Sequence, residues 1–337
     1  MPAFYRSSTV HAMKSLQVEE LGSLDSLHLV ETPDGPLPDS HIRIDIRACG
    51  LNFVDSLLIE GRYQVKPPVP FRPGSEVAGV VTEISRGVTN VSVGDRVFVP
   101  IGVGGFSDSA VVHSARALRL PNNMTDGQAA TFMQSYLTAW FAFRHRADVR
   151  EGDTMLVLGA GGGIGLAAVD LAVSMGVRVI AAASSDEKRQ LAMDAGAFAT
   201  IDVLTEDVKL RARELADGKL DLVYDPVGGD LAEQALRALG SGGQYMVVGF
   251  VAGIPKLPAN LVLLVNRTLV GVDWGAWVGK NQAAHAEMVA EVLKQIGEGR
   301  LHPVEPVSYP MSKAADALRD MQNRKIAGKV ILVPDFS

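Results

Sequence analysis

A run of closely spaced glycines between residues 158 and 165 is the part of the sequence with the clearest chemical use. Glycine lets backbone N–H groups approach a pyrophosphate, and a helix beginning near Ile164 would turn its unpaired N–H groups and positive dipole end toward that anion. Ala160, Gly162 and Gly165 fit the spacing A-x-G-x-x-G, with Gly163 and Ile164 inside it, so the turn predicts a dinucleotide site. The alternative is a tight turn without a ligand. The run reads Leu158-Gly159-Ala160-Gly161-Gly162-Gly163-Ile164-Gly165.

The residues after the next expected strand indicate which dinucleotide binds. An NAD site would place an acid there, about 20 residues beyond the glycines, to bind the ribose hydroxyls. The chain instead has Ser184 and Ser185, followed by Lys188 and Arg189. Hydroxyls and cations suit a 2′-phosphate, which a carboxylate would repel, so NADPH is favoured and NADH stays open. The alternative is that Ser184 only caps the helix, with Glu187 as its capping-box partner.

Strands and helices alternate around this turn. Parallel strands need helical crossovers, so the alternation predicts an α/β fold with a doubly wound parallel sheet of the Rossmann type. Two further helices, at 283–296 and 312–324, and a strand at 329–333 are expected to close the chain. The periodicity places strands at 154–158, 177–182, 199–202, 220–224, 244–248 and 269–273, with helices at 129–140, 164–175, 186–195, 206–216 and 230–239.

The N-terminal third has a different rhythm of short alternating strands separated by turns. Such a pattern predicts a β-rich, barrel-like domain. Residues 1–12 show neither a strand nor a helix pattern and are expected to form a flexible extension. The strands are expected at 16–20, 27–31, 41–48, 77–84, 96–99 and 109–112.

Composition and charge exclude several functional classes. The chain has 337 residues, a length typical of two domains, and a formal net charge of −6. Nucleic-acid binding is not expected, because the sequence is acidic and has no cluster of Lys and Arg. There is one cysteine, Cys49, and no apolar run of the roughly 20 residues that a membrane span needs. Without a signal peptide pattern, a cytoplasmic protein is expected.

Several motifs occur in the order in which one enzyme family has them. The chain from about Met13 to Pro334 resembles the zinc-independent quinone oxidoreductases of the medium-chain dehydrogenase/reductase family, which include zeta-crystallin. The resemblance implies a GroES-like β-barrel domain from residues 13–135 and 276–337, a Rossmann domain from residues 136–275, and a site between them. Besides the glycine turn, the motifs are Asn52-Phe53-Val54-Asp55, Gly61-Arg62-Tyr63, the run from Pro73 to Val81, and Gly94-Asp95-Arg96-Val97.

The resemblance also assigns roles to individual residues. Asn52 and Tyr63 would be catalytic, facing the nicotinamide and the substrate. Phe250 and Trp274 could equally be core or interface aromatics. Relatives that hold a 2′-phosphate often have a tyrosine where this chain has Val203, so one supporting contact for NADPH is missing. The expected cofactor contacts are Thr138, Ala160, Gly162, Gly163, Ile164, Gly165, Ser184, Ser185, Lys188, Val227, Gly249, Phe250, Trp274 and Lys329.

The positions that hold zinc in zinc-dependent relatives carry other residues here. Those relatives have a cysteine at the position of Asn52, a histidine before the acid of Ser75-Glu76, and a lobe with four cysteines. Four-coordinate zinc usually takes several Cys or His ligands, and Cys49 is a single thiol. We therefore expect no metal site, and Cys49 is interpreted as a small buried residue.

The activity implied by the resemblance is hydride transfer from NADPH to a quinone or an α,β-unsaturated carbonyl compound without a metal. Asn52 or Tyr63 would stabilise charge on the acceptor oxygen, and Tyr63 or water would supply the proton. The motifs leave the acceptor open, so an enone reductase of the acrylyl-CoA type and single-electron transfer to a quinone are alternatives. A second class is a non-catalytic binding protein stabilised by NADPH, as among zeta-crystallin relatives.

Self-association is expected on the pattern of the same relatives. The apolar run 261–272 could pair the sheet edges of two Rossmann domains, which would cover an otherwise exposed edge. The sequence therefore predicts a homodimer, a small-molecule substrate, and no membrane partner.

Overall fold

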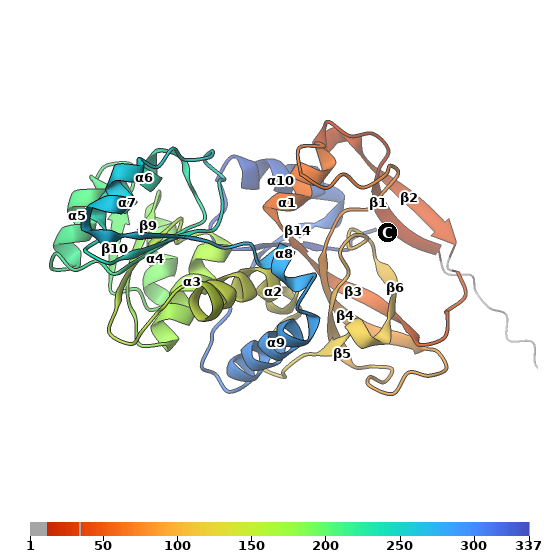
Figure 1. Cartoon of the computed structure of the whole chain (residues 1–337). Helices are drawn as coiled ribbons and strands as arrows, with labels where there is room; N and C mark the ends of the chain where they lie inside the picture. Colours follow the sequence, from red (N-terminus) through yellow and green to blue (C-terminus); the bar gives the residue numbers. More distant parts are fainter. Residues whose placement is uncertain (1–11, 34, 337) are drawn as a thin grey trace, which may run out of the picture.

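The computed structural model describes residues 12–33 and 35–336, which form two β-sheets side by side with helices between and around them (Figure 1). One sheet is parallel, with six strands in the order β10-β9-β8-β11-β12-β13. The first strand in the chain, β8, lies in the middle of the sheet; β9 and β10 follow on one side of it, and β11, β12 and β13 then follow on the other. This order is the doubly wound Rossmann topology that the sequence predicts. The strands are β8 (Thr154–Leu158), β9 (Arg178–Ala183), β10 (Ala199–Asp202), β11 (Leu222–Asp225), β12 (Gln244–Val247) and β13 (Thr268–Gly271).

Helices cover both faces of this sheet, which is why its central strands β8 and β11 are buried along their whole length. All five residues of β8 are buried, as expected for a strand enclosed on both faces. Because the helices alternate with the strands along the chain, each crossover returns the chain to the same end of the sheet. The helices of this part are α3 (Gly163–Ser174), α4 (Asp186–Asp194), α5 (Val208–Leu215), α6 (Gly229–Ala238), α7 (Ala259–Leu263) and α8 (Trp274–Val278).

The second sheet is mostly antiparallel and contains strands from both ends of the chain. Its order is β14-β15-β3-β4-β5-β7, with β6 also paired to β3. The pairing of β15 with β3 brings the C-terminal segment into the N-terminal, GroES-like part, as the resemblance implies. The strands are β3 (His41–Leu51), β4 (Glu76–Ile84), β5 (Arg96–Pro100), β6 (Ser109–His113), β7 (Leu118–Arg119), β14 (Val307–Pro310) and β15 (Val330–Val333).

A separate two-stranded ribbon lies beside this sheet. It pairs β1 (Ala12–Val18) with β2 (Leu27–Pro33). Residue 12 is thus part of a strand, and the prediction that it belongs to an extension is wrong. Residues 1–11, the rest of that predicted extension, lie outside the described residues.

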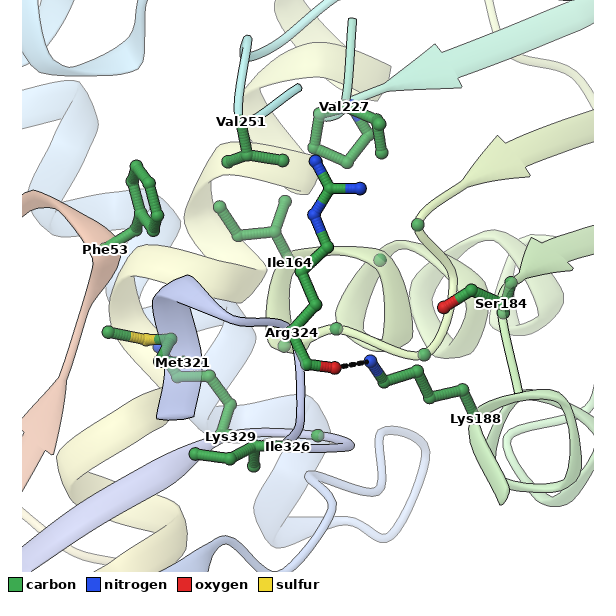
Figure 2. Close-up of a pocket in the computed structure, with 18 of the residues that line it drawn as sticks. Phe53, Ile164, Ser184, Lys188, Val227, Val251, Met321, Arg324, Ile326 and Lys329 are labelled. Atoms are coloured by element: carbon green, nitrogen blue, oxygen red, sulfur yellow. Dashed lines mark hydrogen bonds between the residues drawn. The ribbon is translucent and has the colours of Figure 1, made fainter. Parts of the chain in front are cut away.

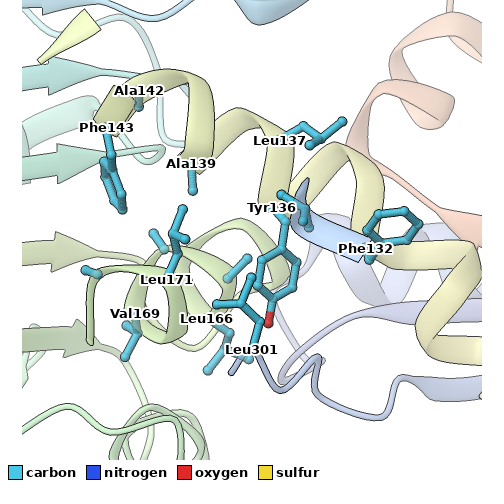
Figure 3. Close-up of a cluster of buried hydrophobic side chains, with 14 of the residues drawn as sticks. Phe132, Tyr136, Leu137, Ala139, Ala142, Phe143, Leu166, Val169, Leu171 and Leu301 are labelled. Carbon is cyan, nitrogen blue, oxygen red and sulfur yellow. The ribbon is translucent and has the colours of Figure 1, made fainter. Parts of the chain in front are cut away.

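Helix α2 (Asp126–Phe141) connects the two parts through the largest apolar cluster (Figure 3). Leu137 and Ala139 of α2 pack with Leu166 and Leu171 of α3 in this cluster. The buried Tyr136 hydroxyl donates to Asp170 Oδ2 over 2.6 Å, and the His302 backbone N–H donates to the same oxygen over 2.8 Å. One buried carboxylate of α3 therefore holds both α2 and the segment that returns to the second sheet.

Three further helices complete the fold, and one of them was not predicted. Helix α1 (Phe53–Ile59) has only seven residues, too few for a helical period to stand out in the sequence. Helices α9 (Gln282–Gly297) and α10 (Ala314–Gln322) fall where the periodicity predicts them. Helix α1 matters for function because it begins directly after Asn52.

The apolar run at 261–272 is only partly a strand. Its first residues form the end of α7 and a turn in which Val265 and Asn266 have φ values of 64° and 56°. The edge strand β13 then begins at Thr268. The run therefore offers four strand residues at the sheet edge.

Candidate functional site

A pocket of about 320 Å³ lies where the glycine turn meets residues 51–54 and residues 321–330 (Figure 2). One end, called the Ser184 end, is lined by Ser184, Lys188 and Arg324. The opposite end, called the Asn52 end, is lined by residues at the start of α1, by Gln134 and by Lys329. The glycine turn lies between them. The pocket thus joins the two parts of the fold, as expected for a cofactor and substrate site.

The glycines of the turn are required by close neighbours. A Cβ at Gly163 would lie 1.9 Å from Lys329 Cδ, and one at Gly165 would lie 2.3 Å from the carbonyl oxygen of Gly159. A Cβ at Gly161 would lie 2.3 Å from Lys188 Cβ. No side chain caps the start of α3, so its first N–H groups are available to a ligand. The observed turn therefore fits a pyrophosphate.

The turn is also bonded to the C-terminal segment. The Gly328 N–H donates to the Gly161 carbonyl over 2.8 Å, and Gly162 and Gly328 form an isolated parallel bridge. Lys329 is the next residue, and its side chain crosses the turn at Gly163. The last segment of the chain is therefore part of the pocket wall.

The Ser184 end is rich in donors and cations. Lys188 Nζ donates to the Arg324 carbonyl over 2.7 Å, and burial together with the nearby Arg324 lowers the pKa of Lys188 (Figure 2). The guanidinium of Arg324 extends toward Val227 and Val251. Its side chain makes no hydrogen bond or ion pair with another described residue. An anion in the pocket would find two cations here.

The two serines after β9 have separate roles. Ser185 caps α4, because its hydroxyl accepts the Lys188 N–H over 3.3 Å. The alternative in which Ser184 is the cap is wrong, and Ser184 lines the pocket instead. Arg189 is paired with Asp202 at 3.2 Å and with Asp186, so its charge is already neutralised.

Val227 is held at the pocket by a buried carboxylate at the end of β11. Asp225 Oδ1 accepts the N–H groups of Val227 and Gly228 over 2.7 and 2.8 Å. The other carboxylate oxygen accepts the hydroxyl of Tyr245 over 2.5 Å. Asp225 is thus a positioning residue for the wall formed by Pro226 and Val227.

The Asn52 end contains a charged cluster in which Asp55 and Glu76 are buried and Lys329 is half-buried. Lys329 Nζ donates to Asn52 Oδ1 over 2.6 Å. Asp55 accepts the Asn52 N–H over 2.8 Å and the Gly74 N–H over 3.3 Å. Asn52 Nδ2 is buried within the cluster, and the Asn52 side chain lowers the pKa of Glu76. Asn52 therefore lies between Lys329 and Glu76.

Burial decides the protonation of this cluster. It raises the pKa of Glu76 to about 7 and that of Asp55 to about 6, although Lys329 lowers both. Burial also lowers the pKa of Lys329, which Glu76 and Asp55 oppose. The charge of Lys329 thus acts on both carboxyl groups.

Nine of the predicted site residues line the pocket together. Their convergence from distant parts of the chain supports the site that the resemblance implies. They are Asn52, Gly162, Gly163, Ile164, Gly165, Ser184, Lys188, Val227 and Lys329.

The other predicted residues lie outside the pocket lining. Tyr63 is 39% exposed, in the loop after α1, and Phe250 is 46% exposed. The Thr138 hydroxyl donates to the Gln134 carbonyl over 2.6 Å within its own helix. Trp274 packs against His285 with ring centroids 5.5 Å apart. Their proposed contacts stay predictions.

Three small or capping residues support the pocket from behind. Ala160 is fully buried, with its N–H donating to Ala182, and Ser185 caps α4. A Cβ at Gly249 would lie 2.9 Å from the Pro226 carbonyl oxygen, so this glycine lets the loop pack against the pocket wall.

Arg324 and Gln134 are the main lining residues that sequence reasoning missed. Arg324 lies 136 positions after Lys188 in the chain, and no local motif marks it. A signal was present in Lys329, which lies close to Arg324 in the sequence and which the resemblance assigns to the cofactor. Val203, where relatives often have a tyrosine, does line the pocket.

Residues 12–33 and 35–336 contain no group of three or more His, Cys, Asp or Glu side chains placed to hold a metal ion. Cys49 is fully buried, and its Sγ would lie 2.8 Å from a Cβ at either Gly74 or Gly105. Its interpretation as a small buried residue is thus confirmed.

None of the helices in the described part of the chain is both long and apolar enough to span a bilayer.

Comparisons with known proteins identify the family of the chain. The family model described as "Zinc-binding dehydrogenase" matches residues 163–294, and "Alcohol dehydrogenase GroES-like domain" matches residues 38–122. Quinone oxidoreductase-like protein 2 homolog of Nematostella vectensis is 37% identical over 301 residues, which cover 88% of this chain and 82% of that protein.

Two solved structures are similar over nearly the whole chain. Quinone oxidoreductase of Escherichia coli, solved in complex with NADPH, has a TM-score of 0.84 and 26% identity, covering 95% of this chain and 100% of its own. A probable oxidoreductase of Mycobacterium abscessus has a TM-score of 0.86 and 32% identity, covering 96% and 99%. From its sequence, its fold and its pocket, the chain belongs to the quinone oxidoreductase family of medium-chain dehydrogenases/reductases.

Proposed function

We propose that the protein is an NADPH-dependent reductase of quinones, with α,β-unsaturated carbonyl compounds as the alternative acceptors. The observation that carries this proposal is a single pocket with a phosphate-binding glycine turn, a cationic Ser184 end and an Asn52 end that offers donors. Bound NADPH would supply a hydride, and therefore both electrons, to the acceptor. The chain's own residues would position the two molecules and stabilise the charge that develops.

The preference for NADPH follows from the charges that line the pocket. Lys188 and Arg324 line it, and no Asp or Glu is among the lining residues. The Ser184 hydroxyl adds a donor beside Lys188. A 2′-phosphate would gain charge-assisted hydrogen bonds here that the 2′-hydroxyl of NADH would not. NADH would bind the same turn more weakly.

The Asn52 end suits a planar, electron-poor acceptor. Phe53, Val54 and Met321 provide apolar surface, and Asn52 lines the same end. A quinone or enone oxygen could accept from its amide. Tyr63, the second predicted catalytic residue, would need its loop to close over the pocket.

Cofactor oxidation in the presence of a chelator tests the proposal. NADPH and NADH are offered in parallel with 9,10-phenanthrenequinone, 1,4-benzoquinone and a simple enone. We expect quinone reduction with NADPH preferred and no effect of the chelator, since the proposed reaction is zinc-independent. Tight NADPH binding without turnover of any acceptor would favour a non-catalytic binding protein. Radical detection by spin resonance would distinguish one-electron transfer.

A homodimer through β13 is a second part of the proposal. Strand β13 is an edge of the parallel sheet, and Leu263, Leu264 and Leu269 near it are 78%, 59% and 40% exposed. Pairing two such edges would bury these side chains and the unpaired backbone groups. A cytoplasmic location stays a prediction, which imaging of the tagged chain would test.

A further inference from the structure

The cluster of Asp55, Glu76 and Lys329 is larger than helix capping or cofactor binding requires. Glu76 is 2% exposed and Asp55 is fully buried. Asp55 accepts two backbone N–H groups, whereas Glu76 Oε2 has no hydrogen-bond partner among the described residues. A buried carboxylate without a counter-charge is costly, and Lys329 is the cation whose charge lowers the pKa of Glu76 against the effect of burial.

We propose that Lys329 is a catalytic residue whose ammonium group, hydrogen-bonded to Asn52 beside Glu76 and Asp55, stabilises the negative charge that develops on the acceptor oxygen. This inference rests on the proposed reductase function and deepens it. Glu76 and Asp55 are positioning residues in this scheme, since they act through Lys329. The cluster would supply the fixed positive charge that a metal ion supplies in metal-dependent carbonyl chemistry.

The path of the Lys329 side chain supports this role over a contact to the pyrophosphate. Its alkyl chain crosses the glycine turn, where Cδ would lie 1.9 Å from a Cβ at Gly163. The ammonium group continues past the turn to the Asn52 end, where it donates to Asn52 Oδ1 over 2.6 Å. A lysine that served the phosphates alone would end at the turn.

Donors remain on the Lys329 ammonium group at the Asn52 end of the pocket. An ammonium group has three N–H bonds, and the hydrogen bond to Asn52 uses one of them. The Asn52 side chain also acts on Glu76, whose pKa it lowers, so Asn52 links the ammonium group to this acid. An acceptor oxygen in the pocket could accept from the remaining N–H bonds of the ammonium group, which would then act as a charged oxyanion donor.

The ionisable groups that face Lys329 come from three elements. Glu76 is on β4 and Asp55 is on α1, and both raise the pKa of Lys329 against the effect of burial. Cys49 on β3 lies near the two acids, and burial raises the pKa of its thiol, so it remains neutral. The two acids therefore oppose the effect of burial on the ammonium group of Lys329.

A charge-balanced pair of variants separates catalysis from structure. Lys329→Met removes the ammonium, and Glu76→Gln in the same chain removes the carboxylate that would be left unpaired. Lys325→Met is the matched control, because Lys325 is exposed and paired with Asp320. Measurements are kcat with a quinone, NADPH affinity by fluorescence quenching, and the thermal unfolding midpoint.

We expect Lys329→Met to lower kcat by about 100-fold, the usual loss for one donor of an oxyanion site. NADPH affinity should change by less than about threefold, whereas a lost charge-assisted bond to phosphate would cost about tenfold or more. Glu76→Gln/Lys329→Met should restore the unfolding midpoint of the wild type but not its kcat. Lys325→Met should leave all three quantities unchanged.

Four other outcomes would overturn the inference. Recovery of kcat in the double variant would make Lys329 only a counter-charge for Glu76, and a loss confined to NADPH affinity would make it a phosphate ligand. Unchanged kcat in Lys329→Met with an active wild type would reject the role of Lys329 alone. A wild type that binds NADPH but reduces no acceptor would reject the proposed function, and the role of Lys329 with it.

A pH profile gives a readout that a purely structural role would not change. Turnover should fall as pH rises through the pKa of Lys329, because the neutral amine cannot stabilise an anion. Glu76→Gln removes the main charge that raises this pKa, so the falling limb should move to lower pH. Lys329→Arg should retain more turnover than Lys329→Met at high pH. An identical falling limb in the wild type and Glu76→Gln would contradict the scheme.

Discussion

Cofactor choice depends on single residues at the Ser184 end of the pocket. Lys188 and Arg324 come from opposite parts of the fold and are joined by a hydrogen bond from Lys188 Nζ to the Arg324 carbonyl. Their charges therefore converge only in the folded chain. Arg189, one residue beyond Lys188, is paired with Asp202 and does not line the pocket. Adjacent cations in the sequence thus have different functions.

Replacing Arg324 should weaken the binding of NADPH more than that of NADH. For Arg324→Gln we expect the Kd of NADPH to rise by about tenfold, the equivalent of about 1.4 kcal/mol, with little change for NADH. Titration of protein fluorescence with each cofactor measures this difference. Arg300→Gln is the control, since Arg300 lies outside this pocket. Equal weakening of NADPH and NADH would place Arg324 at a phosphate common to both.

The buried Glu76 should also make stability depend on pH. Its pKa rises from 4.5 in the unfolded chain to about 7 in the folded protein, chiefly through burial, so the folded state holds the proton more tightly. The resulting stabilisation is present at low pH and is lost as pH rises from about 4.5 to about 7. Urea unfolding over this range should show a flatter pH dependence for Glu76→Gln. A slope equal to that of the wild type would contradict this assignment.

At the scale of elements, the contact between α2 and α3 holds the Rossmann sheet against the rest of the fold. Its polar centre is the bond from the Tyr136 hydroxyl to Asp170, and burial raises the pKa of Tyr136 well above its usual value. The hydroxyl therefore remains protonated and continues to donate. The apolar side chains around it exclude water from this hydrogen bond (Figure 3).

Removing the Tyr136 hydroxyl should lower the free energy of unfolding more than removing a similar hydroxyl near the surface. Tyr136→Phe leaves a buried carboxylate with one donor fewer, so we expect a loss of about 1 to 3 kcal/mol in the free energy of unfolding. Tyr309→Phe is the matched control, because its bond to Asp320 is longer, at 3.1 Å, and only partly buried. Denaturant unfolding measures both. Equal losses of unfolding free energy in the two variants would show that burial of the Tyr136–Asp170 hydrogen bond adds nothing to stability.

The elements differ in how well the sequence predicts them. Strand Thr154–Leu158 matches its predicted bounds, because it is a fully buried and mostly apolar run. The edge strand Ala199–Asp202 has one buried residue and also matches its predicted bounds. Helix α1 was missed because seven residues carry no clear period. The glycine turn was predicted because its chemistry is local. Arg324 was missed because it reaches the pocket through contacts distant in sequence.

At the scale of the whole molecule, the two edges of the parallel sheet differ. β10 forms one edge, and β13, with exposed leucines around it, forms the other. An exposed apolar edge strand favours association with another strand. The proposed dimer would thus be specific for the β13 edge.

A charge on β13 should produce a monomer. Leu269 is 40% exposed on this strand, and Leu269→Lys would place two ammonium groups close together in the proposed dimer. Light scattering should report half the wild-type mass. Leu204→Lys, at a leucine 74% exposed after β10, should leave the mass unchanged. A monomeric wild type would contradict the dimer, and an unchanged mass in Leu269→Lys would exclude this edge.

The bond between Gly328 and the glycine turn has a consequence for biosynthesis. The turn is made before the segment that completes the pocket wall and carries Arg324 and Lys329. A nascent chain that has not yet reached Lys329 therefore lacks part of its cofactor site. NADPH can contact both walls of the pocket only after this segment has been made, so it cannot guide the folding of the glycine turn itself.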